Sequence, residues 1–466
     1  MEPDREQDYR RRIATLEAQL DAALRRVAEL EAQIARLEKN SSNSSKPPSS
    51  DIVKPPGPPR PQGGAKIGAQ PGHVKHERED LPPEQVDHFR SYRLERCPDC
   101  GHRVRRTKQI AQRLQQLELV ASPVEVTEHR AETVWCPRCR TFHATPLPAA
   151  LVKAGLLGPR LTALVGWFKS QGHDSYSIMA EFLRDVARRP VSRGLLAKAI
   201  QKVSVALEAP YARLAQALGS QPWLNVDETG HPEHKKRLHT WVFRADDFTV
   251  FHIDPSRGSE VLVALLGEQF KGVLGCDYFS AYHKYMGEHN VLVQFCLAHL
   301  IRELKFLTTL PEAATRRWAR RMLAGMRRLF GIIHRRDSMT PEKFQRALAR
   351  AREVLLERGK RGPARREVQN LVARFKTNGD AYFRFVTTPG VAPTNNLAEQ
   401  ALRFVVIDRR LTQGTRGLRG RRWCQRIWTA AATCRQQGRS LFEYLCSALQ
   451  ASFTGRQAPS LLTSGP

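Results

Sequence analysis

Three carboxylates in the sequence are spaced so that they could hold a metal ion. Asp227 follows the apolar residues WLNV, and Asp277 follows the apolar residues GVLGC. If these segments are neighbouring parallel strands, both carboxylates emerge at the same end of the sheet. Glu399 lies near the start of the helical segment PTNNLAEQALRF, whose Leu402 face could pack on that sheet. Three converging carboxylates offer the hard oxygen ligands that Mg²⁺ prefers.

Each carboxylate also has a structural interpretation. An Asp at the end of a strand commonly forms a turn. Asn396 with Glu399 three residues later matches the capping box of a helix N-terminus. Taken singly, each residue is better explained by structure than by catalysis.

Two CxxC pairs indicate a zinc site. In each pair a Pro follows the first Cys and sets the turn that lets both thiolates face one ion. The cysteines expected to bind structural Zn²⁺ are Cys97, Cys100, Cys136 and Cys139. His102 and His143 stand close enough in the sequence to replace one of them, and this alternative stays open.

The charge of the chain favours a polyanionic partner. Lys and Arg number 75 against 46 Asp and Glu, a formal net charge of +29. Charge alone does not separate DNA from RNA or from an anionic membrane. The N-terminus has no apolar secretory segment, and we find no apolar run near the roughly 18 residues of a membrane span. A soluble cytoplasmic protein is expected.

The N-terminal residues carry the pattern of a coiled coil. Apolar residues recur alternately three and four positions apart, with Arg, Glu and Gln between them. We expect a coiled coil over residues 8–39 that joins a partner helix, because an isolated helix of this length is marginally stable. One amphipathic helix lying on its own domain is the alternative.

The composition changes after the coiled coil. Pro, Gly and Ser dominate residues 40–90, which predicts a flexible linker. Alternating stretches such as LQQLELV and VEVTEHRAETVW predict short strands, so residues 92–150 are expected to form a small zinc-binding module.

Helical spacing with short breaks follows over residues 155–218, and Ser192 is a candidate N-cap. Three short helices with basic residues that include Arg193 and Lys198 predict a helix-turn-helix-like DNA-binding domain. A helical linker with a solvated basic face is an equally good interpretation.

After Gln221 the pattern becomes strand, turn, strand. PWLNVDET, LHTWVFRA and FTVFHIDP predict a meander, SEVLVALLGEQF a crossover helix, and GVLGCD a fourth strand. This order predicts a mixed sheet with a parallel central pair. The later residues are expected to be helical and very basic, so the whole chain is predicted to be a multidomain α+β protein.

Arginines concentrate just after Glu399. The array comprises Arg403, Arg409, Arg410, Arg416, Arg419, Arg421 and Arg422. Bidentate contacts of guanidinium groups to phosphate would explain Arg in preference to Lys, so these residues are predicted to bind DNA. A solvated basic face is the alternative.

Over nearly its whole length the chain resembles the transposases of insertion-sequence family sixty-six. Its motifs come in order: the leucine-rich coiled coil, NSSNSSKPPSSD, the two CxxC pairs, VDETG, CDYFSAY, CLAHLIRELKF and PTNNLAEQALRF. The segment ETGHPEHKKRLHTW departs from the family pattern by extra His and Lys in its turn. GTRGLRGRRW departs where a Ser is usual after GTR. These departures concern substrate contact and do not touch the carboxylates.

The resemblance implies an RNase H-like mixed α/β catalytic core whose acidic triad maps to Asp227, Asp277 and Glu399. It also places His299 and Arg302 beside the active site, where they could contact DNA; a surface pair near Glu303 is the alternative. The implied division is a first core part over residues 221–300, a helical insertion over 301–390, a second core part with the Glu helix over 391–452, and a disordered tail over 453–466.

The function implied is that of a DDE transposase of the bacterial cytoplasm, associated with the nucleoid. Two Mg²⁺ or Mn²⁺ ions would promote cleavage of transposon ends and joining of the 3′-hydroxyl to target DNA. Double-stranded DNA and, through the coiled coil, a second copy of the chain are the expected partners. Whether accessory proteins take part stays open. A non-catalytic DNA-binding regulator and a structure-selective nuclease on the same core are the alternatives.

Overall fold

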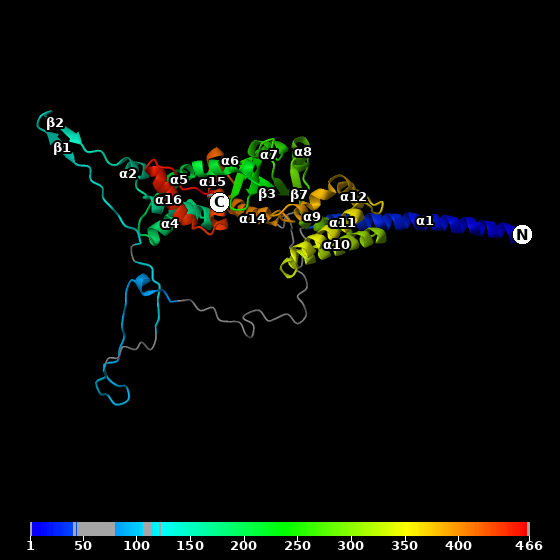
Figure 1. The fold of residues 1–466 in the computed structure, drawn as a ribbon, viewed down its shortest axis with the longest axis horizontal. Helices are drawn as coiled ribbons and strands as arrows, with labels where there is room; N and C mark the ends of the chain where they lie inside the picture. Colours follow the sequence, from blue (N-terminus) through cyan, green and yellow to red (C-terminus); the bar gives the residue numbers. More distant parts are fainter. Residues whose placement is uncertain (1, 41–42, 44–79, 106–112, 121–122, 464–466) are drawn as a thin grey trace. The chain divides into compact units, whose positions relative to one another are not determined.

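The structure is a computed structural model that describes residues 2–40, 43, 80–105, 113–120 and 123–463. Most of the predicted linker lies outside the described residues. The chain divides into two compact units, one of residues 1–55, 129–186 and 190–466 and the other of residues 56–128 and 187–189. Figure 1 shows the elements in chain order, from blue to red.

The N-terminal helix α1 (Glu2–Leu37) carries a stripe of large apolar side chains that are 42–83% exposed. The stripe comprises Ile13, Leu16, Leu20, Leu24, Val27, Leu30, Ile34 and Leu37. At the end of the helix, Arg36 Nη2 lies 2.8 Å from Glu367 Oε1. Lys39 Nζ lies 3.9 Å from the ring centroid of Phe306. The end of α1 therefore has partners, whereas its apolar stripe faces solvent.

The predicted zinc-binding module over residues 92–150, called the zinc-finger region below, has less regular structure than its sequence predicts. Strands β1 (Thr133–Cys136) and β2 (Thr141–Ala144) form an antiparallel hairpin. No strand forms in the described residues 113–120 and 123–132, so the prediction is wrong for LQQLELV and for most of VEVTEHRAETVW, whose last three residues lie in β1. Leu114 and Val126 are 86% and 71% exposed, because their alternating apolar faces have no layer to pack on. A single 3₁₀ turn, η2 (Pro83–Gln85), lies nearer the N-terminus.

Residues 149–220 are mostly helical and are called the helical domain below. Its elements are α2 (Ala149–Ala154), α3 (Pro159–Trp167), the π-helical η3 (Phe168–Gly172), α4 (Tyr176–Asp185), α5 (Arg193–Ala206), α6 (Glu208–Ala217) and η4 (Leu218–Ser220). Ser192 caps α5 by accepting a hydrogen bond from the Leu195 N–H at 3.2 Å, which confirms the predicted N-cap.

The run Ala149–Gly172 is long and apolar enough to cross a membrane by length and composition alone. The sequence expectation that no such run exists is therefore wrong. Within it, α3 packs on α5 and on α16 (Leu441–Phe453), and Ala163 and Val165 are at most 1% exposed. These apolar residues form the core of the helical domain.

A five-stranded mixed sheet carries the candidate site. Its order is β5 (Thr249–Asp254), β4 (Lys236–Arg244), β3 (Trp223–Glu233), β6 (Val273–Cys276) and β7 (Leu292–Phe295). The first two pairings are antiparallel and the last two are parallel. The predicted meander and parallel central pair are present, and β7 is a fifth strand that the sequence pattern did not indicate.

Helices cover the sheet. They are α7 (Ser259–Leu266), α8 (Ser280–His289), α9 (Leu297–Leu307), α14 (Asn396–Thr412) and α15 (Leu418–Gln436). α15 packs on β5, where its Thr429 and Thr433 hydroxyls accept hydrogen bonds from the backbone N–H groups of Phe251 and Thr249. α14 packs on β3 and β4.

The far end of α14 is held by a buried acid. Asp408 Oδ1 lies 2.8 Å from His173 Nδ1, and its Oδ2 accepts a hydrogen bond from Trp428 Nε1 at 3.1 Å. Since His173 follows η3 and Trp428 lies in α15, this carboxylate joins α14 to the helical domain and to the helix that covers β5.

Helices also dominate residues 301–390, as predicted. They are α10 (Ala313–His334), η5 (Arg336–Ser338), α11 (Pro341–Gly359), α12 (Arg366–Asn378), η6 (Gly379–Tyr382) and α13 (Arg384–Thr387). After α16 the expected disordered tail is wrong for residues 454–463. Leu461 is 2% exposed, and its carbonyl accepts a hydrogen bond from Gln437, so burial of this side chain holds the segment in place.

Candidate active site

Strand β3 is longer than its apolar pattern predicts. It extends to Glu233, so Asp227 lies in the middle of the strand and not at its end. The parallel pairing with β6 covers only Trp223–Asn225, however, and Asp277 directly follows β6. Both carboxylates therefore emerge just beyond the parallel pairing, at the edge of the sheet where the sequence placed them.

The start of α14 is fixed to β3 by Asn395. Its Nδ2 donates to the Val226 carbonyl at 2.8 Å, and its Oδ1 accepts from Asn225 Nδ2 at 2.9 Å. The helix begins at Asn396 and has no side-chain cap, so the capping-box interpretation of Asn396 and Glu399 is wrong. Glu399, in the first turn, is thereby free to serve another role.

Helix α9 presents two side chains to Glu399. Arg302 Nη2 donates to Glu399 Oε2 at 3.2 Å, and His299 Nδ1 lies 3.6 Å from Oε1. Glu303 is engaged elsewhere, because Arg374 donates to it at 2.9 Å. The interpretation of His299 and Arg302 as a surface pair near Glu303 is therefore wrong.

The three carboxylates keep oxygen atoms available for a cation. Asp227 Oδ1 accepts from the Glu228 N–H at 2.9 Å, and Asp277 Oδ1 accepts from the Phe279 N–H at 3.0 Å. Their Oδ2 atoms have no hydrogen bond with any described residue. Glu399 Oε1 is buried and also lacks a hydrogen bond within the described chain. Oxygen atoms left in this way fit a hard divalent cation such as Mg²⁺.

Burial and like charge act on the pKa values of this site. Burial raises the pKa of Asp227 well above its usual range, and the neighbouring charges of Glu228 and Asp277 raise it further. Burial, followed by the charge of Glu228, raises the pKa of Asp277 to about 7. Carboxylates held together against their own repulsion are typical of a site completed by a cation.

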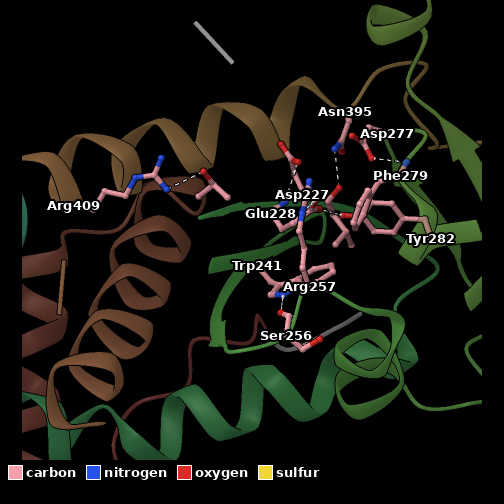
Figure 2. A network of polar contacts seen from close by, with 12 residues as sticks. Asp227, Glu228, Trp241, Ser256, Arg257, Asp277, Phe279, Tyr282, Asn395 and Arg409 are labelled. Carbon is pink, nitrogen blue, oxygen red and sulfur yellow. Dashed lines mark hydrogen bonds and ion pairs between the residues drawn. The ribbon is translucent and has the colours of Figure 1, made fainter. Parts of the chain in front are cut away.

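A polar network behind the carboxylates was not predicted. Glu228, whose side chain is 1% exposed, accepts from Arg257 Nη2 at 2.7 Å and from the Tyr282 hydroxyl at 2.5 Å. The Arg257 guanidinium lies 4.0 Å from the ring centroid of Phe279, whose N–H binds Asp277. Figure 2 shows how this network links the segments that carry Asp227 and Asp277. The sequence signal that could have indicated this network is Glu228 itself, a charged residue inside an apolar strand in VDET.

A second group of possible ligands shares Glu399. Ligand atoms of Cys296, His299 and Glu399 lie within 4.8 Å of one another. Cys296 Sγ accepts the Asn395 N–H at 3.1 Å, and burial raises the pKa of its thiol. Since metal binding needs the thiolate, this environment favours a hydrogen-bonded thiol at Cys296.

The arginines after Glu399 fall into two groups. Two of them hold β3: Arg409 Nη1 donates to Thr229 Oγ1 at 2.9 Å, and Arg421 Nε lies 2.9 Å from Glu233 Oε2. The exposed members of the array are Arg403, Arg410, Arg416, Arg419 and Arg422. Arg193 and Lys198 on α5 are exposed as well. The structure thus leaves these seven basic residues accessible to a ligand.

In the first zinc knuckle, the Gly101 N–H donates to the Cys97 carbonyl at 2.9 Å, and the Cys97 N–H donates to His102 O at 2.8 Å. Gly101 has a φ of +73°, which suits glycine. Hydrogen bonds from the backbone of Cys100 and Asp99 lower the pKa of the Cys97 thiol. A lowered pKa favours the thiolate that zinc needs.

In the second knuckle, ligand atoms of Cys136, Cys139 and His143 lie within 4.8 Å of one another. A hydrogen bond from the Cys139 backbone lowers the pKa of the Cys136 thiol. His143 is therefore placed to join the thiolates, the alternative that the sequence left open. This donor set fits zinc.

Comparison with known families agrees with this geometry. The family described as "Transposase IS66 family" matches residues 154–422, more than half of the chain. The protein is therefore a transposase. It belongs to the IS66 family, as the sequence resemblance indicated. Membership implies that the protein binds DNA.

Two shorter matches cover the N-terminal part. The zinc-finger binding domain of transposase IS66 matches residues 95–140, and a family of unknown function matches residues 2–79. The zinc-finger match and the Cys136, Cys139 and His143 cluster together support structural zinc. No curated protein matches the sequence.

Proposed function

We propose that this transposase cleaves transposon ends and joins the freed 3′-hydroxyl to target DNA, with Asp227, Asp277 and Glu399 as ligands of two Mg²⁺ or Mn²⁺ ions. The convergence of three carboxylates with unused oxygens carries the proposal. The strand order of the mixed sheet supports an RNase H-like core. Membership of the IS66 family supports DNA as the substrate.

The bound ions would activate the attacking water in cleavage and the 3′-hydroxyl in joining, and would stabilise the leaving oxygen of each in-line displacement. The protein's part is to hold the ligands. Asn395 fixes the start of the Glu399 helix, and Glu228 with Arg257 supports the Asp227 and Asp277 segments. Arg302 offsets the charge of Glu399, and it lies where it could contact a substrate phosphate.

Other parts of the chain would bind and organise DNA. The exposed Arg403, Arg410, Arg416, Arg419 and Arg422 can contact phosphates, as can Arg193 and Lys198 on α5 if the helical domain reads DNA. The exposed apolar stripe of α1 supports a coiled coil with a second copy of the chain. Zinc would fold the knuckles without taking part in the chemistry.

The test compares Asp227→Asn, Asp277→Asn and Glu399→Gln with the wild type on duplex oligonucleotides that carry a transposon end. Each variant should lose cleavage and strand transfer while binding the duplex with near-normal affinity, since metal ligands make few phosphate contacts. Glu268→Gln, at an exposed acid in the turn after α7, is the matched control and should keep full activity.

The same assay separates the alternatives. A non-catalytic regulator binds the duplex without cutting it, and a structure-selective nuclease cuts without joining. Cleavage that survives in any one of the three variants would remove that residue from the ligand set.

A further inference from the structure

The β3–β4 hairpin carries a run of exposed basic residues at its tip. Glu233 pairs with Lys236 across a two-residue turn, in which His234 has a φ of +50°. His234, Lys235, Lys236 and Arg237 are all exposed. This turn is the segment in which the sequence departs from the family pattern by extra His and Lys.

The tip is attached to the arginine-bearing loop between α14 and α15. The His234 N–H donates to Thr415 O at 3.2 Å, and the Thr415 N–H donates to Pro232 O at 3.0 Å. Gly414 has a φ of +78°, and a Cβ there would collide with Pro232 O. The two segments, about 180 residues apart in sequence, thus form one surface.

A buried cluster fixes this junction. The ring nitrogens of His231 lie 3.1 Å from the hydroxyls of Thr240 and Thr415, and Thr415 Oγ1 donates to Glu233 Oε2 at 2.9 Å. Arg421 binds the same oxygen of Glu233. Because Glu233 is engaged inside the cluster, its charge does not neutralise the tip.

A hollow of about 350 Å³ lies between the hairpin and α14. None of the eight described residues that line it is acidic, and four are Lys or Arg: Lys235, Lys236, Arg237 and Arg409. Residues 229–237 and 408–422 together have a net charge of +7, and both of their acids are buried in internal contacts. Burial, and then the charges of Arg410 and Arg237, lower the pKa of Arg409. Cations held together in this way favour an anionic ligand.

We propose that this hollow binds a backbone phosphate of duplex DNA, as a contact separate from the metal site. The choice of DNA as the anionic ligand rests on the proposed function. Along β3, Pro232 lies five positions beyond Asp227. At about 3.3 Å per residue this is about 17 Å, or roughly five base pairs of duplex at 3.4 Å each. The hairpin therefore holds DNA that flanks the reacting phosphate.

The experiment measures duplex binding at several salt concentrations for the variant Lys235→Gln, Lys236→Gln, Arg237→Gln. Each lost phosphate contact lowers the slope of log affinity against log salt by about 0.9, so the slope should fall by about 1 to 3. The control, Lys343→Gln, Arg346→Gln, Arg350→Gln on exposed positions of α11, removes the same charge and should leave the slope nearly unchanged.

A charge-retaining variant, Lys235→Arg with Lys236→Arg, should keep the wild-type slope, which shows that the lost charge and not the replacement of these side chains changes binding. An unchanged slope in the Gln variant, an equal fall in the α11 control, or loss of slope in the Arg variant overturns the proposal. If the wild-type chain itself does not bind duplex DNA, the proposed function fails. If it binds and the Gln variant matches it, only the hollow fails.

Discussion

The carboxylate site and the zinc-finger region hold their polar residues in opposite ways. Around the carboxylates, Asn395 as a whole residue is 1% exposed and the Glu228 side chain is also 1% exposed, and both are bonded to neighbouring segments. In the zinc-finger region, Cys100 and Cys139 are exposed, and Trp135 and Phe142 are 49% and 69% exposed. One region is positioned by a core, whereas the other has almost none.

This difference in burial indicates where a metal ion would contribute to the free energy of folding. At the carboxylate site the sheet and helices position the side chains by themselves, so on the proposed function an ion there would add charge balance and chemistry and not folding free energy. A region with so little buried surface must obtain its folding free energy from the bound ion. Three measurements can break or sharpen this contrast.

The largest effect is expected from the zinc ligands. Cys136→Ser with Cys139→Ser should remove zinc and unfold the region around residues 95–144, because structural zinc contributes on the order of 10 kcal/mol to such folds. Metal analysis should show zinc lost, and limited proteolysis should cut that region while sparing the sheet. Retention of zinc, or cutting throughout the chain, would contradict the contrast.

A smaller loss is expected at the network behind the carboxylates. Arg257→Gln leaves Glu228 buried without its cation, which should lower the free energy of unfolding by about 3 kcal/mol. Arg160→Gln is the control, since Arg160 and its partner Glu443 are 66% and 58% exposed and such a pair contributes less than about 1 kcal/mol. Denaturant unfolding compares them, and equal losses would show that the network does not hold the site.

The pH dependence of the metal-free protein should give the smallest effect. An unfolded Asp titrates near 3.9, whereas the pKa of Asp277 is raised to about 7 in the folded chain. The folded state therefore favours the protonated carboxyl. Its stabilising contribution is full below about pH 4 and is lost as the pH rises through 7.

Thermal unfolding of the metal-free protein should accordingly show a decline in stability between about pH 4 and 7 that is reduced in Asp277→Asn. Added Mg²⁺ should raise the stability of the wild type more at the upper end of this range, because it binds the ionised form. A metal-free stability that rises with pH in the wild type but not in Asp277→Asn would show that the site does not penalise the charge.

Local patterns predicted the helices, the meander and the parallel pair well. They failed where a partner distant in sequence decides the outcome. Strand β3 continues past its apolar residues because β4 and the loop around Thr415 pair with it. The four-residue β7 forms a strand because it pairs with β6.

The candidate site shows the same limit. Asp227, Asp277 and Glu399 stand out by type and position, and in the structure the charges of Asp277 and Glu399 both act on Asp227. The roles of Asn395, Arg257 and Tyr282 depend on contacts with residues that are distant in the sequence. These partners lie 169, 29 and 54 residues away, respectively. In the sequence, Arg409 and Arg421 cannot be told apart from the other arginines of the basic run. Only their contacts with β3 distinguish them.

Helix α14 has a mechanical consequence. It carries Glu399 in its first turn and Asp408 nine residues later, about 14 Å along one stiff axis. Asp408 is held by His173 of the helical domain, so Glu399 and that domain are attached to the same helix. A displacement of the helical domain would therefore also move the start of α14, where Glu399 lies. The position of this carboxylate is coupled in this way to anything that the helical domain binds.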